Sequence, residues 1–393
     1  MAALIGVAVT PFGGCGAAQR SDGTAWSTKA QSASGDVTSD SEIPTPSHSG
    51  DEHVLARPAS RSGEEGTRRD LAQRAGQLDP GAMRHEALEV ARGASASNSA
   101  ILRAHAIEAL LSAPAELDSV VGRGLIDSNR GVRFVAAMAI AKTRRTELAH
   151  LVEPLLSDSS DSVRAAALAA LAACGRNPDL SPLAAMVRSD NPEVRANAYL
   201  ALGVIGNPSA IPLVRESIGG GFDRADPARV KVVDLQAAEC LVRLGRSDDL
   251  EPIRAALFAP MEQSEVTALA CQMIGRLKDA HSRPMLQRLI EAERESARPS
   301  EVRLAALEAL GNVGVDGDRL LPILRPFVQS RSSAIRAQTC LALAATGSQG
   351  ALVWLDGLLR DGDAEVRVAA ASAILSLTTG ERAWMSSPPP QRF

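Results

Sequence analysis

Few residues in this 393-residue chain could do chemistry, and their spacing matches no common type of reactive site. There are five cysteines and six histidines. No two cysteines form a Cys-x-x-Cys pair, and no histidines stand at the spacing of zinc ligands. The sequence contains no Gly-x-Ser-x-Gly nucleophile motif and no cysteine with a nearby histidine partner. We therefore predict that the protein is not an enzyme and needs no metal or cofactor.

One dipeptide, His85-Glu86, could still bind a metal. It resembles the His-Glu helix starts that hold a di-iron centre in the deoxyhypusine hydroxylases, which use several such pairs. The corresponding positions of later helices in this chain carry residues such as Arg-Ala and Arg-Leu. Because a single pair cannot complete the set, we interpret it as an exposed polar pair on an early helix.

Cys15 is a candidate for lipidation. An apolar run over residues 4–12 is followed by glycines and then this cysteine, which is the form of an export signal. The small residues before it resemble the lipobox of bacterial lipoproteins, and this resemblance implies that residues 1–15 are a signal and that Cys15 carries lipid. Phe12 stands where leucine is usual, and the missing basic residues indicate a start upstream of Met1. The alternative is the apolar N-terminus of a cytoplasmic protein.

Residues 16–70 are rich in Ser, Gly, Ala, Thr, Asp and Glu and poor in large aliphatics. Such a segment cannot bury enough apolar surface to offset its ordering entropy, so we expect a disordered linker. The chain has a net charge of −4, most of which lies in residues 1–70, and the remainder is nearly balanced. This charge disfavours a nucleic-acid partner. No apolar run is long enough to span a bilayer, so we expect membrane attachment only through a lipid anchor.

A Val-Arg motif returns at intervals of roughly 30–39 residues through the rest of the chain. Small residues and then a large aliphatic follow it at fixed offsets. The clear copies are Val132-Arg133, Val163-Arg164, Val194-Arg195, Val302-Arg303 and Val366-Arg367, and the looser ones are Leu102-Arg103, Val233-Asp234, Val266-Thr267 and Ile335-Arg336. A period of this size indicates stacked supersecondary units.

Each unit has the helix-start and helix-end signals of a helical hairpin. Capping residues precede a first helix, and glycines mark the exits of the first helices: Gly175, Gly206, Gly245, Gly314 and Gly347. Prolines mark the opening turns of the second helices: Pro182, Pro212, Pro252, Pro284 and Pro322. The fold class we predict is all-α, a right-handed α-solenoid of about nine stacked helical hairpins with a disordered N-terminal tail. A capping helix would span residues 71–95, the solenoid 96–380 and a C-terminal tail 381–393.

The repeated pattern L-x-D-x-x-x-x-V-R-x-x-A-x-x-A-L-G resembles the HEAT repeats, and within them the short repeats of the phycobilisome lyases. It is clearest from Leu156 to Leu171 and from Leu359 to Ile374. The resemblance implies a non-catalytic scaffold that binds another protein, tethered to the cell envelope or free in the cytoplasm. A lyase-type enzyme or enzyme subunit is the alternative that the repeat type implies.

The resemblance also suggests roles for two sets of charged residues. Aspartates stand six positions before several repeat arginines, as with Asp158 and Arg164, and such side chains form ladders between neighbouring HEAT repeats. Second helices commonly line the concave face of these solenoids. A column of arginines would therefore face a partner with an acidic surface or peptide, since arginine binds carboxylates well. These candidates are Arg215, Arg254, Arg288, Arg325 and Arg360.

Overall fold

The computed structural model describes residues 61–220, 227–291 and 297–379, and all of them belong to one compact unit. Within these residues the regular structure is entirely helical, as predicted. The first helices of the repeats are α3 (Ala100–Ala109), α5 (Arg130–Thr143), α7 (Asp161–Ala173), α9 (Pro192–Ile205), α11 (Pro227–Arg243), α13 (Ser264–Leu277), α15 (Ser300–Asn312), α17 (Ser333–Thr346) and α19 (Ala364–Thr378).

The second helices run between successive first helices, and all of them except α4 are shorter than the first helix that precedes them. They are α4 (Pro114–Leu125), α6 (Ala149–Val152), α8 (Ser181–Met186), α10 (Ile211–Ser217), α12 (Glu251–Ala256), α14 (Arg283–Glu291), α16 (Gly317–Val328) and α18 (Leu352–Leu358). Two further helices, α1 (Arg61–Ala75) and α2 (Pro80–Ser95), precede the repeats. The described residues thus contain eight consecutive hairpins, and α19 begins a ninth.

The local signals explain where these helices begin and end. The side chain of Asn129 accepts hydrogen bonds from two backbone N–H groups at the start of α5, and Asp363 does the same for α19. All five glycines predicted at first-helix exits have positive φ, between 62° and 97°, a conformation that glycine adopts at little cost. One proline prediction is wrong. Pro322 lies inside α16, because Asp316 caps that helix and starts it well before the proline.

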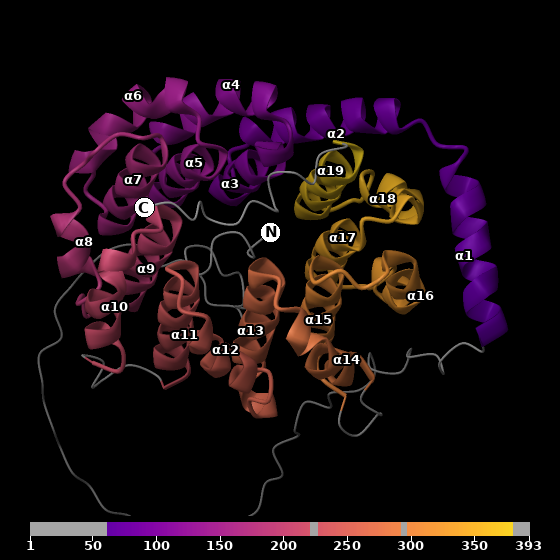
Figure 1. Ribbon diagram of the computed structural model, residues 1–393. Coiled ribbons are helices and arrows are strands. Elements are labelled where there is room, and N and C mark those ends of the chain that lie inside the picture. The colour runs from indigo at the N-terminus through magenta and orange to yellow at the C-terminus, as the bar shows by residue number, and fades with distance from the viewer. Residues whose placement is uncertain (1–60, 221–226, 292–296, 380–393) are drawn as a thin grey trace, which may run out of the picture. The chain divides into compact units, whose positions relative to one another are not determined.

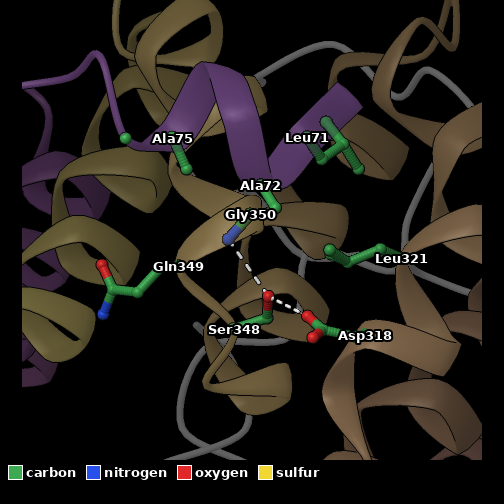
Figure 2. Close-up of a pocket in the computed structure, with 9 residues that line it drawn as sticks. Leu71, Ala72, Ala75, Asp318, Leu321, Ser348, Gln349 and Gly350 are labelled. Carbon is green, nitrogen blue, oxygen red and sulfur yellow. Dashed lines mark hydrogen bonds between the residues drawn. The ribbon is translucent and has the colours of Figure 1, made fainter. Parts of the chain in front are cut away.

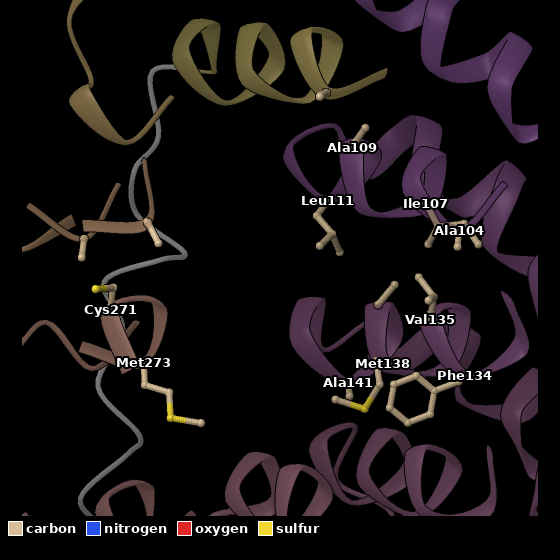
Figure 3. Close-up of a cluster of buried hydrophobic side chains, with 14 of the residues drawn as sticks. Ala104, Ile107, Ala109, Leu111, Phe134, Val135, Met138, Ala141, Cys271 and Met273 are labelled. Atoms are coloured by element: carbon tan, nitrogen blue, oxygen red, sulfur yellow. The ribbon is translucent and has the colours of Figure 1, made fainter. Parts of the chain in front are cut away.

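The first helices form one continuous packed series, in which each contacts the next from α3 to α19. Their alanines permit this close approach: Ala136, Ala167 and Ala306 are completely buried. Figure 3 shows Ile107 of α3 and Val135 of α5 pointing toward each other within this core. Second helices pack mainly against the first helices on either side of them, which makes the first helices the main structural layer.

The series closes on itself, because α2 and α3 at its start pack against α19 at its end. α2 lies between α19 and α3 in the position that a second helix occupies in the other repeats, so the ninth hairpin combines helices from both ends of the region (Figure 1). Arg84 of α2 donates to the backbone oxygen of Leu375 at 3.3 Å and to that of Ser112 at 3.4 Å. Arg360 and Glu86 form an ion pair across the same seam at 2.7 Å.

The structure corrects two predictions. The first helices form the inner layer and the second helices the outer layer (Figure 1), so the expectation that second helices line a concave face is wrong. The predicted linker 16–70 and single helix 71–95 also differ from the structure. α1 begins at Arg61, and Asp79 caps a separate α2 that starts with Pro80. Residues 16–60 and the predicted tail 381–393 lie outside the described residues.

Candidate functional site

A ladder of Arg–Asp pairs joins neighbouring repeats along one edge. In each pair the guanidinium donates two hydrogen bonds, of 2.7–3.0 Å, to an aspartate 24 or 25 positions later. The pairs are Arg103–Asp127, Arg133–Asp158 and Arg336–Asp361. Arg133 also donates to the backbone oxygen of Asp127 at 2.8 Å, which connects the first rung to the second. The predicted ladder between repeats is therefore present.

The ladder carboxylates are held in the ionised form. The hydrogen bond from Arg103 lowers the pKa of Asp127, and the bond from Arg336 does the same for Asp361. Both bidentate pairs are largely shielded from solvent, and this geometry fixes the register of adjacent repeats. We interpret the ladder as a structural feature.

The ladder is interrupted in the middle of the region, where the sequence replaces arginine with Asp234 and Thr267. Arg195 there is buried and donates to backbone oxygens, including that of Ser217 at 3.2 Å. Arg254 of the second helix α12 binds Asp279 with two bonds, at 2.8 and 2.9 Å. A second-helix arginine thus takes over the role that a first-helix arginine has in the other rungs.

The arginines predicted to bind a partner divide into two groups. Three pair with carboxylates of this chain: Arg254 with Asp279, Arg215 with Asp249 at 3.2 Å, and Arg360 with Glu86. The other two, Arg288 on α14 and Arg325 on α16, are exposed. All five belong to second helices or the turns after them, so they lie in the outer layer and do not line an inner groove.

The inner layer contains a cluster of charged residues that the sequence analysis did not identify. Glu239 of α11 accepts hydrogen bonds from Arg243 at 2.8 Å and from Arg276 of α13 at 2.7 Å. Burial alone would raise its pKa, but the two guanidinium groups hold the pKa at about 2. Lys142 of α5 interacts electrostatically with this cluster, and burial lowers its pKa to about 8. Burial also raises the pKa of Glu308 on α15.

A sequence signal for this cluster did exist. Glu108, Glu239 and Glu308 each lie five positions after the repeat arginine or its replacement, in helices that are otherwise mainly apolar. Charged residues at one register of a buried helix indicate a common environment. The three glutamates belong to α3, α11 and α15, which are all first helices of the inner layer.

A row of exposed large apolar side chains follows the ends of second helices. Ile126 comes directly after α4 and is 84% exposed, and Phe258 follows α12 and is 55% exposed. Leu156 and Ile218 stand at comparable places after α6 and α10. These four residues, which we call the apolar row, all lie between a second helix and the next first helix. Ile126, Ile218 and Phe258 lie in turns, and Leu156 lies in the short 3-10 helix Glu153–Ser157. Large apolar residues that are exposed at this place in several repeats are candidates for an interaction surface.

The model of the HEAT-repeat family matches residues 119–193, 148–225 and 294–375. The chain is a HEAT-repeat protein. This family accounts for the tandem hairpins, the Arg–Asp ladder and the apolar core described above. No match was found among curated protein sequences.

Several solved structures resemble this HEAT-repeat chain at low sequence identity. Human deoxyhypusine hydroxylase with glycerol is 15% identical, with a TM-score of 0.33, and the match covers 82% of this chain and all of that one. The CpcE–CpcF complex of phycocyanin lyase from Nostoc sp. PCC7120 is 19% identical, with a TM-score of 0.30. That match covers 65% of this chain and 92% of the other. Kap121p bound to the SUMO protease Ulp1p is 14% identical, with a TM-score of 0.31. That match covers 72% of this chain and 36% of the other.

The residues considered for chemistry do not gather into a site in the HEAT repeats. His85 is exposed, while Glu86 pairs with Arg360. Among the described residues, no group of three or more His, Cys, Asp or Glu side chains is arranged to hold a metal ion. The four described cysteines are buried thiols without disulfide bonds: Cys174, Cys240, Cys271 and Cys340. Burial raises the pKa of Cys240 to about 12, so its reactive thiolate form is scarce at neutral pH.

Cys15, the predicted lipidation site, lies outside the described residues. No helix in the described ranges is both long and apolar enough to cross a membrane.

Proposed function

We propose that this HEAT-repeat protein is a non-catalytic scaffold that binds another protein through the apolar row. The observation that supports this proposal most directly is the exposure of Ile126 and Phe258, large side chains that water solvates poorly. The exposed large apolar residues of the described ranges all fall between residues 126 and 261, so they are confined to one part of the repeat series. Burying a phenylalanine or isoleucine at an interface contributes about 1.5–3 kcal/mol.

The neighbouring charges suggest what kind of partner fits. Ile218 stands three residues after Arg215, and that arginine is paired with Asp249. Arg188, at the end of α8 where the apolar row is interrupted, is exposed and makes a long pair with Glu216 at 3.4 Å. Exposed pairs of this kind contribute little to stability, so a carboxylate of the partner could replace the intramolecular one at small cost. The partner we propose has an apolar contact surface with acidic residues at its margin.

The test is a direct binding measurement with a partner isolated from native cell extract, identified and purified. We compare the wild-type chain with an Ile126→Glu/Phe258→Glu variant. The expected result is a loss of affinity of at least tenfold with unchanged helical content, because two side chains that the partner would bury become charged. The control is Arg288→Glu, which changes an exposed residue of the outer layer far along the chain from the row. Equal affinity of the wild type and the apolar-row variant would refute the proposal.

We also propose that the scaffold is tethered to the cell envelope through lipid on Cys15. The sequence features that support this are the apolar run and the small residues before the cysteine. Metabolic labelling with an alkyne fatty acid should label the wild-type protein and not a Cys15→Ser variant, and the label should accompany the membrane fraction. Unlabelled protein in the soluble fraction would favour the cytoplasmic alternative. A chromophore that remains bound through purification would instead favour the lyase-type alternative.

A further inference from the structure

α1 is the one helix of the described region that lies outside the closed series of hairpins. It packs on the outer layer, against α16, α18 and the short turn Gln349–Ala351 (Figure 1). Leu71 is the only buried residue among the α1 side chains that the structure describes, and it is 2% exposed. The described side chains of α1 form no hydrogen bond with α16 or α18, and Asp70 pairs with Arg74 of the same helix at 3.7 Å. One leucine therefore anchors this helix.

The surface under α1 is shaped for a helix. Leu71 packs beside Gly350, where an added Cβ would lie 3.5 Å from the leucine Cβ and 2.9 Å from Leu321. The glycine thus allows a helix to approach closely. Beside it the backbone N–H of Gly350 donates to Ser348 Oγ at 3.1 Å, and the Ser348 hydroxyl donates to Asp318 (Figure 2). These bonds hold the turn in place, and the surface that α1 covers is formed by α16, α18 and this turn.

α1 fills this surface incompletely. A pocket of about 490 Å³ remains between α1 and this surface. On the α1 side, Ala72 and Ala75 line it together with Leu71 (Figure 2). Leu321 supplies an apolar wall, and Asp318 is the charged residue among those that line it. Two alanines thus lie where larger side chains would find apolar surface, and a carboxylate lies where a basic side chain would find a partner.

We propose that this surface, the α16–α18 groove, is a docking site for an amphipathic helix of a partner protein. In the free protein α1 occupies the groove weakly, and the partner helix displaces it. The partner helix would carry a leucine at the position of Leu71, larger apolar residues at those of Ala72 and Ala75, and a basic residue near Asp318. The proposal deepens the scaffold function and adds a second binding surface to the apolar row.

The experiment uses the full chain and a fluorescein-labelled synthetic peptide of residues 59–77 that carries Ala72→Leu and Ala75→Leu. Fluorescence anisotropy measures its binding to the wild-type chain and to a Leu71→Asp variant, in which α1 cannot stay seated. We expect the Leu71→Asp chain to bind the peptide at least tenfold more tightly than the wild type does. The matched control peptide carries Gln73→Leu alone, which adds an apolar residue away from the pocket, and it should bind at least fivefold more weakly.

A second measurement does not depend on the peptide. Hydrogen exchange of residues 61–75 should be slower in an Ala72→Leu/Ala75→Leu chain than in the wild type, and faster in the Leu71→Asp chain, while exchange in α16 and α18 shows that both variants are folded. Failure of the Leu71→Asp chain to bind the peptide, equal binding by both chains, or equal binding of both peptides would overturn the proposal. None of these outcomes bears on binding through the apolar row, so a failure here is distinct from a failure of the scaffold function.

Discussion

Replacing Glu239 with glutamine removes the charge that holds Arg243 and Arg276 together in the inner layer. Glutamine keeps the shape of the side chain, so the change tests charge and not packing. The difference between the ordinary pKa of 4.5 and the value of about 2 in the folded protein corresponds to about 3 kcal/mol of stabilisation. Because the Glu239 side chain is only 9% exposed, solvent screening reduces this value little. We expect the free energy of unfolding of Glu239→Gln to fall by about 3 kcal/mol at pH 7.

The pH dependence of this loss distinguishes an ionised carboxylate from a merely polar one. The folded pKa lies below the unfolded pKa, so the stabilisation is complete above pH 4.5 and is lost as the pH falls toward 2. Urea unfolding of the wild type and Glu239→Gln at several pH values should therefore show a constant difference from pH 7 to about 5, which shrinks at lower pH. Taking the difference removes the contribution of titratable groups that do not interact with Glu239.

The control is Glu216→Gln, which alters a carboxylate that is 68% exposed and pairs with Arg188. It should change the unfolding free energy by less than about 1 kcal/mol at every pH. A Glu239→Gln loss below about 1 kcal/mol, or a loss that stays constant down to pH 3, would refute the assignment of an ionised Glu239 between two arginines.

Four further substitutions test the packing and the ladder. Gly311→Ala places a Cβ 2.5 Å from a backbone oxygen of α17 and should lower stability by about 1–3 kcal/mol, whereas Gly357→Ala meets no atom within 4 Å and should raise it by about 0.5–1 kcal/mol in urea unfolding. Asp158→Asn weakens the ladder rung to Arg133 and should cost about 1–3 kcal/mol, and a double-mutant cycle with Arg133→Ala that shows no coupling would contradict the rung. Ala167→Leu overpacks a fully buried contact and should lower the melting temperature, and an unchanged value would show that the site has room.

The repeats and the ends of their helices were predictable because they depend on local sequence signals. The Val-Arg period, the left-handed glycines such as Gly175 and the capping side chains act over a few residues, and they depend little on the rest of the fold. The ladder was predictable as a contact between repeats, but its pairing was not. Asp158 lies six positions before Arg164, yet its side chain binds Arg133 of the preceding repeat, while Arg164 reaches only its backbone oxygen. Sequence spacing does not determine which of two near arginines points toward a carboxylate.

The closure and the inner face could not be predicted in the same way. Arg84 and Leu375 are 291 positions apart, and α2 has no feature in its sequence that marks it as the partner of α19. Periodicity shows which side of a helix is buried, but the direction in which a stack curves depends on small differences in spacing that accumulate over all repeats. For this reason Arg215 and Arg325 were expected on a concave face, although the second helices form the outer layer.

The central claim is that the repeat series is closed by α2 packing between α19 and α3. The most direct test is a distance measurement by pulsed electron resonance between spin labels at Glu86→Cys and Arg360→Cys, in a chain whose Cys15 is replaced by serine. The two native side chains are in contact across the seam, at 2.7 Å, so the labels should lie within about 20 Å of each other. An open stack with helices about 8–10 Å apart would separate them by several tens of ångströms. A narrow short distance is the expected result, and a distribution centred beyond about 40 Å would contradict the closed series.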